Sequence, residues 1–376
     1  MPDTPTATRL AILIHSLSAG GAERVAVHLA NGFAARRWQV ALLTLEPAAG
    51  DFYAVDARVD RIGLDVAGPA GGLVGALAGN ARRLRAIRRA LARGRYDAVL
   101  ALTAEVSVLA ILATRGLGLR VVVSERIHPP ALRLGRAWHR LRRLVYPHAD
   151  QVVVQTEDTR RWIERHTPGA RARVIPNPVV LPLPGAEPRL PPAQLLGPDR
   201  RLLLAVGRLS PQKGFDLLIP AFSRIAADHP AWTLVILGEG AERTALEALV
   251  AAHGQQARVL LPGHAGNLED WYRRASLFVL SSRFEGFPNA LVEAMAHGCP
   301  AVAFDCPTGP RDLVRDGVDG VLVTATDSAD ALSGALARAM GDDALRARLS
   351  SRATEVAARF DPDTILEHWE RTLLSR

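Results

Sequence analysis

Short apolar runs alternate along this chain with longer segments that have the spacing of amphipathic helices. The runs in the first half are RLAILI (9–14), QVALLTL (39–45), DAVLAL (97–102), RVVVSE (120–125) and DQVVVQT (150–156). The second half holds RLLLAVGR (201–208), WTLVILG (232–238), RVLLPG (258–263), LFVLSS (277–282) and PAVAFD (300–305). Strands that are apolar on both sides are typical of parallel sheets covered by helices on both faces. The pattern therefore predicts an α/β chain with two Rossmann-like domains that face each other across a cleft.

A proline-rich segment separates the two halves. Residues 176–200 hold eight of the 25 prolines, and proline lacks the N–H that a helix interior or a central strand needs. The chain has 376 residues, more than one core usually supports. We therefore expect a first domain at 1–175, a linker at 176–200 and a second domain at 201–360. A C-terminal helix at 361–376 is expected to pack back on the first domain.

Ligands of open parallel sheets bind beyond the carboxyl ends of the strands, and three loops at such places are notable. The first is HSLSAGGAERV, where Gly20 and Gly21 stand between a strand and a helix. Close backbone approach and the free N–H groups of a helix start suit a phosphate there. Two adjacent glycines also suit an ordinary tight turn, so both interpretations stay open.

The second loop, GRLSPQKGFD, contains Arg208 and Lys213. Lys213 is the only lysine among 46 basic residues in this arginine-rich chain. Lysine supplies a compact point charge, whereas arginine supplies a wide planar fork. Two cations at the end of a parallel strand favour a diphosphate ligand over the alternative that Lys213 is a solvated residue at a helix start.

The third loop is FEGFPNALVEAMAHGCP, in which seven residues separate Glu285 from Glu293. Asn289 is a candidate N-cap for the helix that follows. Backbone N–H groups near such a helix start are expected to approach a phosphate, and they belong to Gly286, Phe287, Asn289, Ala290 and Leu291. The two carboxylates suit hydroxyl groups on either side of that phosphate, although each glutamate alone also fits a surface position.

The net charge of +8 is unevenly distributed. From Arg82 to Ala149, fifteen arginines stand against three carboxylates, so this block carries +12 and the rest of the chain is net acidic. Such a block indicates an anionic partner, which a membrane surface, a nucleic acid or a phosphorylated substrate would supply. Nucleic acid is disfavoured because few aromatic side chains for base stacking are interleaved with these arginines.

Two segments of this block, 85–95 and 132–146, have the pattern of basic amphipathic helices. The second places four apolar side chains on one stripe, Leu134, Trp138, Leu141 and Val145. Arginines surround that stripe, among them Arg136, Arg140 and Arg143. This pattern suits a helix that lies on an anionic membrane, and it equally suits ordinary packing in the core of the first domain.

The motifs GRLSPQKG and FEGFPNALVEAMAHGCPAVAFD resemble those of the retaining glycosyltransferases of family 4, which have the two-Rossmann-domain B architecture. GGAER and VIPNPV extend the resemblance over nearly the whole chain. It implies that the first domain binds an acceptor and the second a nucleotide sugar. Arg208 and Lys213 would bind the donor diphosphate in place of a metal ion, so the resemblance implies catalysis without a metal or another cofactor.

The resemblance also implies separate roles for the other candidates. Glu293 would hold the ribose hydroxyls, and Glu285 would contact the sugar with help from the backbone of 286–291. Gly20 and Gly21 would approach the distal phosphate. Many members of the family have a histidine after the fourth apolar run that touches the sugar; in SERIHPP its equivalent is Glu125 or His128, and the sequence does not decide between them.

HSLSAGGAERV and FDCPTGPRDLVRDG resemble bacterial N-acetylhexosaminyl transferases, including N-acetylgalactosamine transferases, that extend lipid-linked glycans. This likeness implies a UDP-sugar donor and a polyprenyl diphosphate-linked acceptor. The alternatives are a hexosyltransferase of lipopolysaccharide or exopolysaccharide assembly and, from another class, a nucleotide-sugar epimerase. No signal peptide or spanning segment is evident and both cysteines fit free thiols, so we expect a cytoplasmic protein at the inner face of the plasma membrane.

Overall fold

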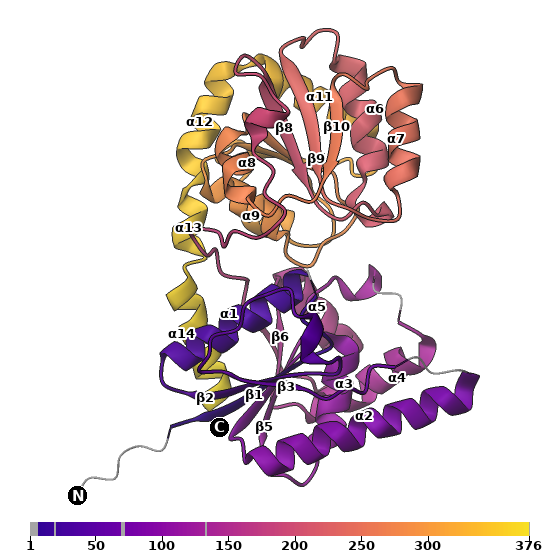
Figure 1. Cartoon of the computed structure of the whole chain (residues 1–376), viewed down its shortest axis with the longest axis vertical. Helices are drawn as coiled ribbons and strands as arrows, with labels where there is room; N and C mark the ends of the chain where they lie inside the picture. The colour runs from indigo at the N-terminus through magenta and orange to yellow at the C-terminus, as the bar shows by residue number, and fades with distance from the viewer. Residues whose placement is uncertain (1–6, 19, 69–71, 132–133, 376) are drawn as a thin grey trace, which may run out of the picture. The chain divides into compact units, whose positions relative to one another are not determined.

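The computed structural model describes residues 7–18, 20–68, 72–131 and 134–375, and the chain divides into two compact units. Unit 1 comprises Met1–Asn177 and Asp363–Arg376, and unit 2 comprises Pro178–Pro362 (Figure 1). Each unit has one sheet with helices on both faces, and every described strand pair is parallel. The predicted class of two Rossmann-like α/β units is confirmed.

The sheet of unit 1 has seven strands in the order β3-β2-β1-β4-β5-β6-β7. Their bounds are β1 (Arg9–Ile14), β2 (Gln39–Thr44), β3 (Asp60–Gly63), β4 (Ala98–Leu102), β5 (Arg120–Ser124), β6 (Gln151–Val154) and β7 (Ala172–Val174). The helices of this unit are α1 (Gly21–Ala35), α2 (Gly72–Gly94), α3 (Ala104–Thr114), α4 (Arg136–Val145), α5 (Glu157–His166) and α14 (Pro362–Leu374). Because β5, β6 and β7 are neighbours, the loops that follow them meet at one edge of the sheet.

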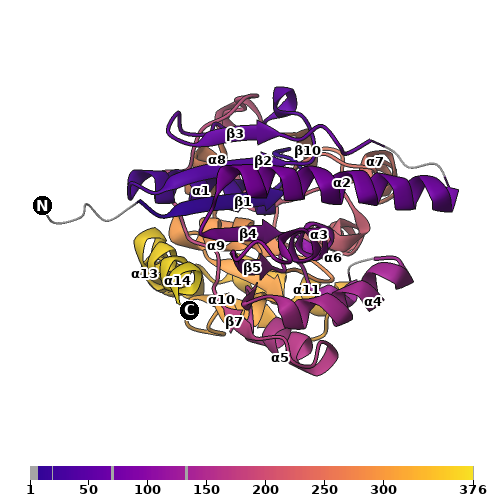
Figure 2. The same cartoon turned by 90° about the horizontal axis from the view of Figure 1, so that it is seen from below.

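Alternation along the strands of unit 1 fills two separate cores. Leu10 and Ile12 of β1 join the core beneath α1 and α14, whereas Ala11 and Leu13 join the core beneath α2, α3, α4 and α5. Figure 2 shows α2, α3 and α4 as neighbouring helices on that second face. Side chains that point alternately to the two faces explain why the strands are apolar throughout.

The sheet of unit 2 has six strands in the order β10-β9-β8-β11-β12-β13. Their bounds are β8 (Arg201–Val206), β9 (Trp232–Leu237), β10 (Val259–Gly263), β11 (Leu277–Leu280), β12 (Ala301–Phe304) and β13 (Gly320–Val323). The helices are α6 (Phe215–Ile225), α7 (Arg243–Ala252), α8 (Leu268–Arg274), α9 (Asn289–Ala296), α10 (Pro310–Leu313), α11 (Ala329–Gly341), α12 (Asp343–Ala353) and α13 (Glu355–Arg359). The strand order reverses between β8 and β11, so their carboxyl ends flank the switch point at which such sheets bind ligands.

The C-terminal helix α14 packs on unit 1. Leu366 and Trp369 are buried in the core beneath α1, and an added Cβ on Gly32 of α1 would lie 2.8 Å from Leu366 Cδ2. Arg36 Nη1 donates to Glu370 Oε2 at 2.8 Å across the same contact. The last helix therefore completes the N-terminal core rather than extending unit 2.

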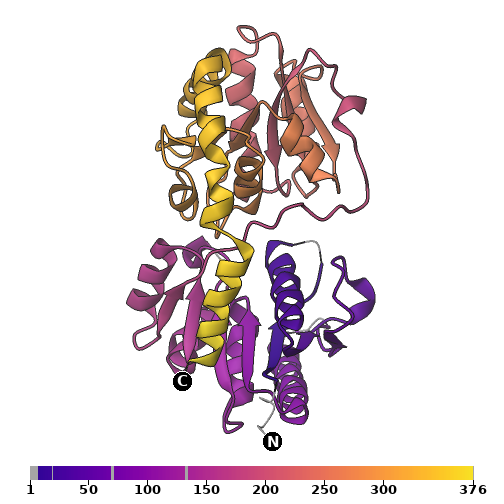
Figure 3. The same ribbon diagram turned by 90° about the vertical axis from the view of Figure 1, so that its left-hand side faces the viewer.

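The proline-rich segment, which the sequence predicts as a linker at 176–200, lies from residue 178 onward within unit 2 (Figure 3). Val179 and Leu196 are buried in the core of that unit. The Leu190 N–H donates to Asn267 Oδ1 at 2.8 Å, and Trp271 Nε1 donates to the Leu190 carbonyl at 2.8 Å. Asn267, which precedes α8, and Trp271 of α8 thus make hydrogen bonds with the backbone of a segment that its prolines exclude from helix and sheet.

Candidate functional site

The loop after β8 places Lys213 against the end of β11. A short 3-10 turn (Pro211–Lys213) precedes Gly214, which has φ of 65°. A Cβ on Gly214 would lie 2.1 Å from the Ser281 carbonyl oxygen, so glycine is required for both the conformation and the close approach. The aliphatic stem of Lys213 lies over Gly207, with Cε 3.0 Å from the position of a Cβ there. The local backbone therefore fixes where the single lysine ammonium lies.

Lys213 and Glu285 form an ion pair at the carboxyl ends of β8 and β11. Lys213 Nζ lies 2.6 Å from Glu285 Oε1, and the side chains are 18% and 7% exposed. Ser282 Oγ donates to the same carboxylate oxygen at 2.6 Å. Lys213 is therefore not a solvated residue at a helix start. The structure brings together two residues that the sequence singled out independently.

Arg208 lies in the same loop with an exposed side chain. No hydrogen bond or ion pair from its guanidinium is found in the part of the chain that the structure describes. The loop thus presents one exposed cation, Arg208, and one that is mostly buried, Lys213. Both are at the strand end where a diphosphate is expected.

The loop that carries Glu285 is held by the loop after β12. The Glu285 N–H donates to the Pro307 carbonyl at 2.9 Å, and Thr308 Oγ1 donates to the Glu285 carbonyl at 3.0 Å. Thr308 is 1% exposed, so these hydrogen bonds are shielded from solvent. The backbone of Glu285 is therefore fixed while its carboxylate faces Lys213.

Two details of α9 differ from the sequence prediction. The helix begins at Asn289 itself and its N-cap is Pro288, so Asn289 is not the N-cap. The Leu291 N–H donates to the Pro288 carbonyl at 3.0 Å and is not available to a phosphate, because the first turn closes one residue earlier than predicted. Gly286, Phe287 and Ala290 donate no backbone hydrogen bond to any described residue.

Glu293 lies one turn inside α9 and is 5% exposed. The Tyr272 hydroxyl of α8 donates to Glu293 Oε2 at 3.1 Å. Glu285 instead contacts Lys213 and Ser282. The two glutamates of the motif therefore have different surroundings.

Gly20 and Gly21 lie at the start of α1, with Gly20 as N-cap in an extended conformation. The carboxylate of Glu23 lies against Gly20, with Oε2 2.1 Å from the position of a Cβ there. An acidic group in the first turn complements the helix dipole. The helix start that we expect to approach a phosphate thus carries a carboxylate of its own.

Glu125, a sequence candidate for the sugar-facing group, is 1% exposed and points into the core of unit 1. Its Oε1 accepts a hydrogen bond from the Tyr146 hydroxyl at 2.6 Å and lies 3.3 Å from Arg142 Nη1. Burial, and beside it the Glu125 carboxylate, raises the pKa of Tyr146, so this phenol stays protonated and donates. Glu125 therefore fastens α4 to the sheet and does not face a ligand.

Replacing Glu125 with glutamine should lower the free energy of unfolding by about 2 kcal/mol, because Arg142 would keep a buried charge without its counter-charge. Urea denaturation monitored by circular dichroism measures this change. Replacing Arg142 with methionine in the same chain should restore part of the loss. A Glu125→Gln variant with unchanged stability would argue against a structural role.

Three polar side chains that sequence reasoning did not assign form a cluster after β5, β6 and β7. Arg126 donates through Nη2 to Asn177 Oδ1, and Gln155 Nε2 donates to the same oxygen at 2.8 Å. Arg126 Nη1 also donates to Ser124 Oγ at 3.4 Å. His128, the other candidate for the sugar-facing group, follows in the same loop, and burial lowers its pKa. All these residues lie in loops that follow the carboxyl ends of strands, which is the signal that could have identified them.

Helix α4 presents a different face to the surface than predicted. Val145 is buried and Trp138 packs against the core, together with the buried Arg142. Leu141 and Leu144 are 37% and 67% exposed. The exposed side also carries three arginines of the predicted membrane helix, Arg136, Arg140 and Arg143.

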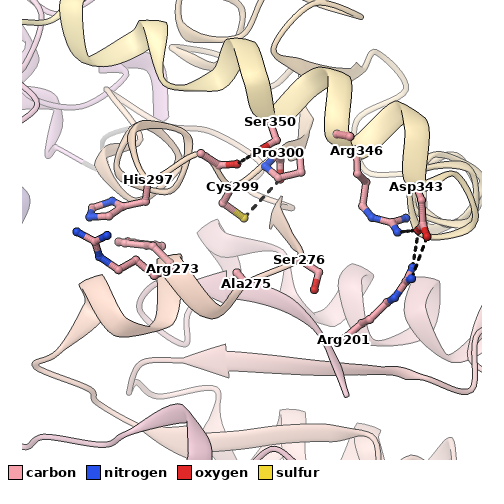
Figure 4. A pocket seen from close by; sticks show the side chains of 13 residues that line it. Arg201, Arg273, Ala275, Ser276, His297, Cys299, Pro300, Asp343, Arg346 and Ser350 are labelled. Atoms are coloured by element: carbon pink, nitrogen blue, oxygen red, sulfur yellow. Dashed lines mark hydrogen bonds and ion pairs between the residues drawn. The ribbon is translucent and has the colours of Figure 1, made fainter. Parts of the chain in front are cut away.

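A cavity of about 510 Å³ lies at the amino ends of strands in the unit 2 sheet, whereas the candidate site lies at their carboxyl ends (Figure 4). Its lining includes Arg201, Ser276 and Pro300, which stand at or before the starts of β8, β11 and β12. It contains none of the site residues that the sequence predicts. Tyr272 connects it to the candidate site, because this residue lines the cavity and holds Glu293.

Among the described residues, no group of three or more His, Cys, Asp or Glu side chains is arranged to hold a metal ion. Within the same residues, no helix has the length and apolar character to cross a membrane. Cys299 and Cys306 are free and buried, and burial raises the pKa of both thiols. They are therefore unreactive packing residues.

Two family models match the chain. Residues 187–356 match the model for glycosyl transferases group 1, and residues 20–178 match the glycosyl transferase 4-like domain. An exopolysaccharide phosphotransferase from Streptomyces coelicolor is 37% identical over 67% of this chain, but this match spans only 26% of that protein's length.

Two further relatives match over nearly their full length. The amylovoran biosynthesis glycosyltransferase AmsD from Erwinia amylovora is 25% identical, over 97% of this chain and 99% of AmsD. An undecaprenol-linked-glycan α-1,4-N-acetyl-D-galactosaminyltransferase from Campylobacter jejuni is 26% identical, over 96% of this chain and 97% of the relative.

Solved structures of similar fold cover almost the whole chain. A sucrose-phosphate synthase from Thermosynechococcus elongatus superposes with a TM-score of 0.84 at 22% identity, over 97% of this chain and 98% of that one. The Anabaena protein HepE in complex with UDP and glucose superposes with a TM-score of 0.77 at 22% identity, over 98% of this chain and 100% of HepE. At this level of identity, the likeness establishes the fold.

Proposed function

Since the chain belongs to the group 1 glycosyl transferases of family 4, we propose that it transfers an N-acetylhexosamine from a UDP-sugar to a lipid-linked glycan. The expectation from the sequence of a retaining hexosyltransferase is confirmed by the family matches. The observation that carries the donor chemistry is the ion pair of Lys213 and Glu285 at the switch point of the unit 2 sheet. A nucleotide-sugar epimerase is not supported, because both family models are those of transferases.

In this proposal, unit 2 binds the donor through charge. Arg208 and Lys213 hold the diphosphate, and the N–H groups of Gly286, Phe287 and Ala290 add hydrogen bonds beside it. The resemblance adds Asn289 to this set, whereas Leu291 contributes packing only, because its N–H is used within the helix. Glu293, held in place by Tyr272, binds the ribose hydroxyls.

Lys213 and Glu285 are in contact, and in this proposal both act when the bond between sugar and phosphate breaks. When the bond between sugar and phosphate breaks, negative charge builds on the leaving diphosphate and positive charge on the sugar ring. The Lys213 ammonium stabilises the first, and the Glu285 carboxylate favours the second. Before the donor binds, each side chain neutralises the charge of the other, so neither is an unpaired charge in this largely buried position.

Two of the relatives support the choice of donor and acceptor. HepE binds UDP in its solved complex, and the Campylobacter relative is named for transfer of N-acetylgalactosamine to an undecaprenol-linked glycan. The amylovoran relative favours an exopolysaccharide acceptor as the alternative.

A panel of UDP- and GDP-sugars, incubated with and without an undecaprenyl diphosphate-linked glycan, tests the proposal through released nucleotide. We expect acceptor-dependent release of UDP from a UDP-N-acetylhexosamine. Sugar isomerisation without acceptor would contradict it.

We further propose that the exposed side of α4 lies on an anionic membrane. Leu141 and Leu144 supply apolar contact, and Arg136, Arg140 and Arg143 supply positive charge around them. Val74 and Leu77 of α2 are 81% and 71% exposed on the same side of the unit 1 sheet as α4. Each arginine near an anionic surface contributes about 1 kcal/mol of attraction.

Replacing Arg136, Arg140 and Arg143 with glutamine should lower binding to anionic vesicles by at least about tenfold, because three near-surface charges are lost. Vesicle sedimentation measures this change. Transfer to a short water-soluble acceptor should stay within about twofold. A matched control replaces three exposed arginines of unit 2, Arg338, Arg348 and Arg352. Equal loss of binding in both triple variants would point to net charge alone and contradict a specific role for α4.

A further inference from the structure

The guanidinium of Arg126, at the carboxyl end of β5, is held by neutral groups only. Its hydrogen bonds go to Ser124 Oγ and Asn177 Oδ1, and neither acceptor carries charge. Its Nε atom is shielded from solvent and has no partner among the described residues. Within the same residues, no carboxylate lies within ion-pair distance of Arg126.

Other unsatisfied polar atoms gather around Arg126. Gln155 is 5% exposed, and its Oε1 has no hydrogen-bond partner in the described part of the chain. His128 Nδ1 is also shielded from solvent and has no partner among those residues. Gln155 follows β6 and Asn177 follows β7, the two strands next to β5. The cluster therefore stands where ligands of a parallel sheet bind. Buried polar groups in native proteins are almost always paired, so the unpaired Arg126 Nε and His128 Nδ1 indicate a ligand, whereas the acceptor Gln155 Oε1 would point away from an anion.

The electrostatics point to an anion as this ligand. Burial lowers the pKa of Arg126 to about 10, and the Glu23 carboxylate opposes this shift from a distance. The side chain is therefore still protonated at neutral pH. The adjacent Glu125 cannot neutralise it, because Glu125 is bound to Arg142 and Tyr146. A partly buried charge with no carboxylate at ion-pair distance costs free energy that a bound anion recovers.

We propose that Arg126, with Asn177 and Gln155 as the residues that position it, forms an oxyanion site in unit 1 that binds a phosphoryl group of the acceptor. This inference rests on the proposed function, which supplies an acceptor linked through a diphosphate. A guanidinium binds phosphate oxygens in a planar fork, and the unpaired ring nitrogen of His128 in the same loop adds a further donor. The donor diphosphate has its own cations in unit 2, Arg208 and Lys213. Within unit 1, the Glu125–Arg142 ion pair joins the Arg126 loop to α4, which we propose to lie on the membrane.

Calorimetric titration with inorganic pyrophosphate tests the site without any knowledge of the acceptor. The full chain should bind at two sites, Arg126→Met should lose one, and Lys213→Met should lose the other. Arg171→Met, which removes an exposed arginine of unit 1, is the matched control and should keep both. Pyrophosphate binding that is unchanged in Arg126→Met would overturn the proposal. Loss in Arg126→Met with no change in Lys213→Met would keep this site and contradict the donor site instead.

A stability measurement separates a binding role from a structural one. Arg126→Met removes a charge that has no carboxylate at ion-pair distance, so its melting temperature without pyrophosphate should equal or exceed that of the unaltered chain. The rise in melting temperature that pyrophosphate induces should shrink in Arg126→Met and in Gln155→Leu, and Arg126→Lys should keep part of it. A large fall in melting temperature in Arg126→Met, with a normal pyrophosphate effect in Gln155→Leu and Arg126→Lys, would overturn the proposal.

Kinetics distinguish the two sources of phosphate. In Arg126→Met, the KM for an undecaprenyl diphosphate-linked glycan should rise at least about tenfold, since a charged hydrogen-bond partner is lost. The KM for the UDP-sugar should stay within about twofold. The same glycan as a phosphate-free alkyl glycoside should be used equally well by both proteins. A raised KM for the UDP-sugar, or an equal loss with the phosphate-free glycan, would overturn the assignment to the acceptor.

Discussion

Replacing Lys213 with alanine is expected to lower kcat by about two to three orders of magnitude, the range found when one preorganised charge stabiliser is removed. The ammonium lies 2.6 Å from Glu285 and is largely shielded from water, so its charge acts at reduced screening. Its stem is confined over Gly207, and the following Gly214 fixes the turn. Steady-state kinetics with a UDP-sugar and a saturating acceptor measure the change.

Lys213→Arg provides the control for charge against shape. The wider guanidinium has to fit between Gly207 and Glu285, where the lysine stem already makes close contact. We therefore expect this variant to recover only a small part of the lost rate. Full activity in Lys213→Ala would remove Lys213 from the reaction. Full activity in Lys213→Arg would show that charge alone suffices.

Replacing Glu285 with glutamine is expected to lower kcat by about two orders of magnitude with little change in the affinity for free UDP. The carboxylate favours positive charge that develops on the sugar ring only in the transition state. It also holds Lys213 in place, so part of the loss arises from a less confined ammonium. UDP lacks the sugar, so its binding does not report on this contact.

Glu293→Gln is the matched variant, because it makes the same chemical change eight positions further along the motif. Glu293 is held by Tyr272 and is proposed to bind the ribose, which does not react. We expect a raised KM for the donor and weaker binding of UDP, with kcat changed less. Calorimetric titration of UDP into both variants separates the roles. Loss of UDP affinity in Glu285→Gln alone would mean that the two roles are reversed.

The sequence predicted all the central strands of both sheets and one edge strand, β10, whose run is apolar enough to be recognised. The pattern did not identify β3, β7 and β13, which are short strands at the edges of the two sheets. β3 reads DRIG and is partly exposed along its length, so it lacks the apolar run that marks a central strand. An edge strand is defined by its neighbour in space, which a local pattern does not contain.

Glu125 shows how strand parity could have corrected the sequence interpretation. Val121 and Val123 of β5 point into the core beneath α3 and α4, whereas Val122 points to the other core. Glu125 lies two residues beyond Val123 and so faces the same side of the sheet as Val121 and Val123, where it is buried beneath α4. Alternation along a strand therefore favoured a buried Glu125. What the pattern did not indicate is that Arg142 lies on the buried side of α4, where it pairs with Glu125.

Residues of the unit 2 site were easier to predict than their contacts. Lys213 stood out as the single lysine, and Glu285 and Glu293 as a motif. Their spacing along the chain did not indicate that Lys213 pairs with Glu285 rather than lying beside Arg208. That pairing depends on the close approach of Gly214 to Ser281, a contact between loops 67 residues apart in the chain.

Modification of the single lysine tests the role of the Lys213–Glu285 pair most directly, because an amine-selective reagent reports on one side chain. Reductive methylation of Lys213, followed by peptide mass spectrometry, can be timed with and without a UDP-sugar and needs no acceptor. We expect slow modification of the unaltered protein, faster modification of Glu285→Gln, and clear protection by the UDP-sugar in the unaltered protein. Modification of Lys213 at the same rate with and without a saturating UDP-sugar would contradict a donor site at this pair.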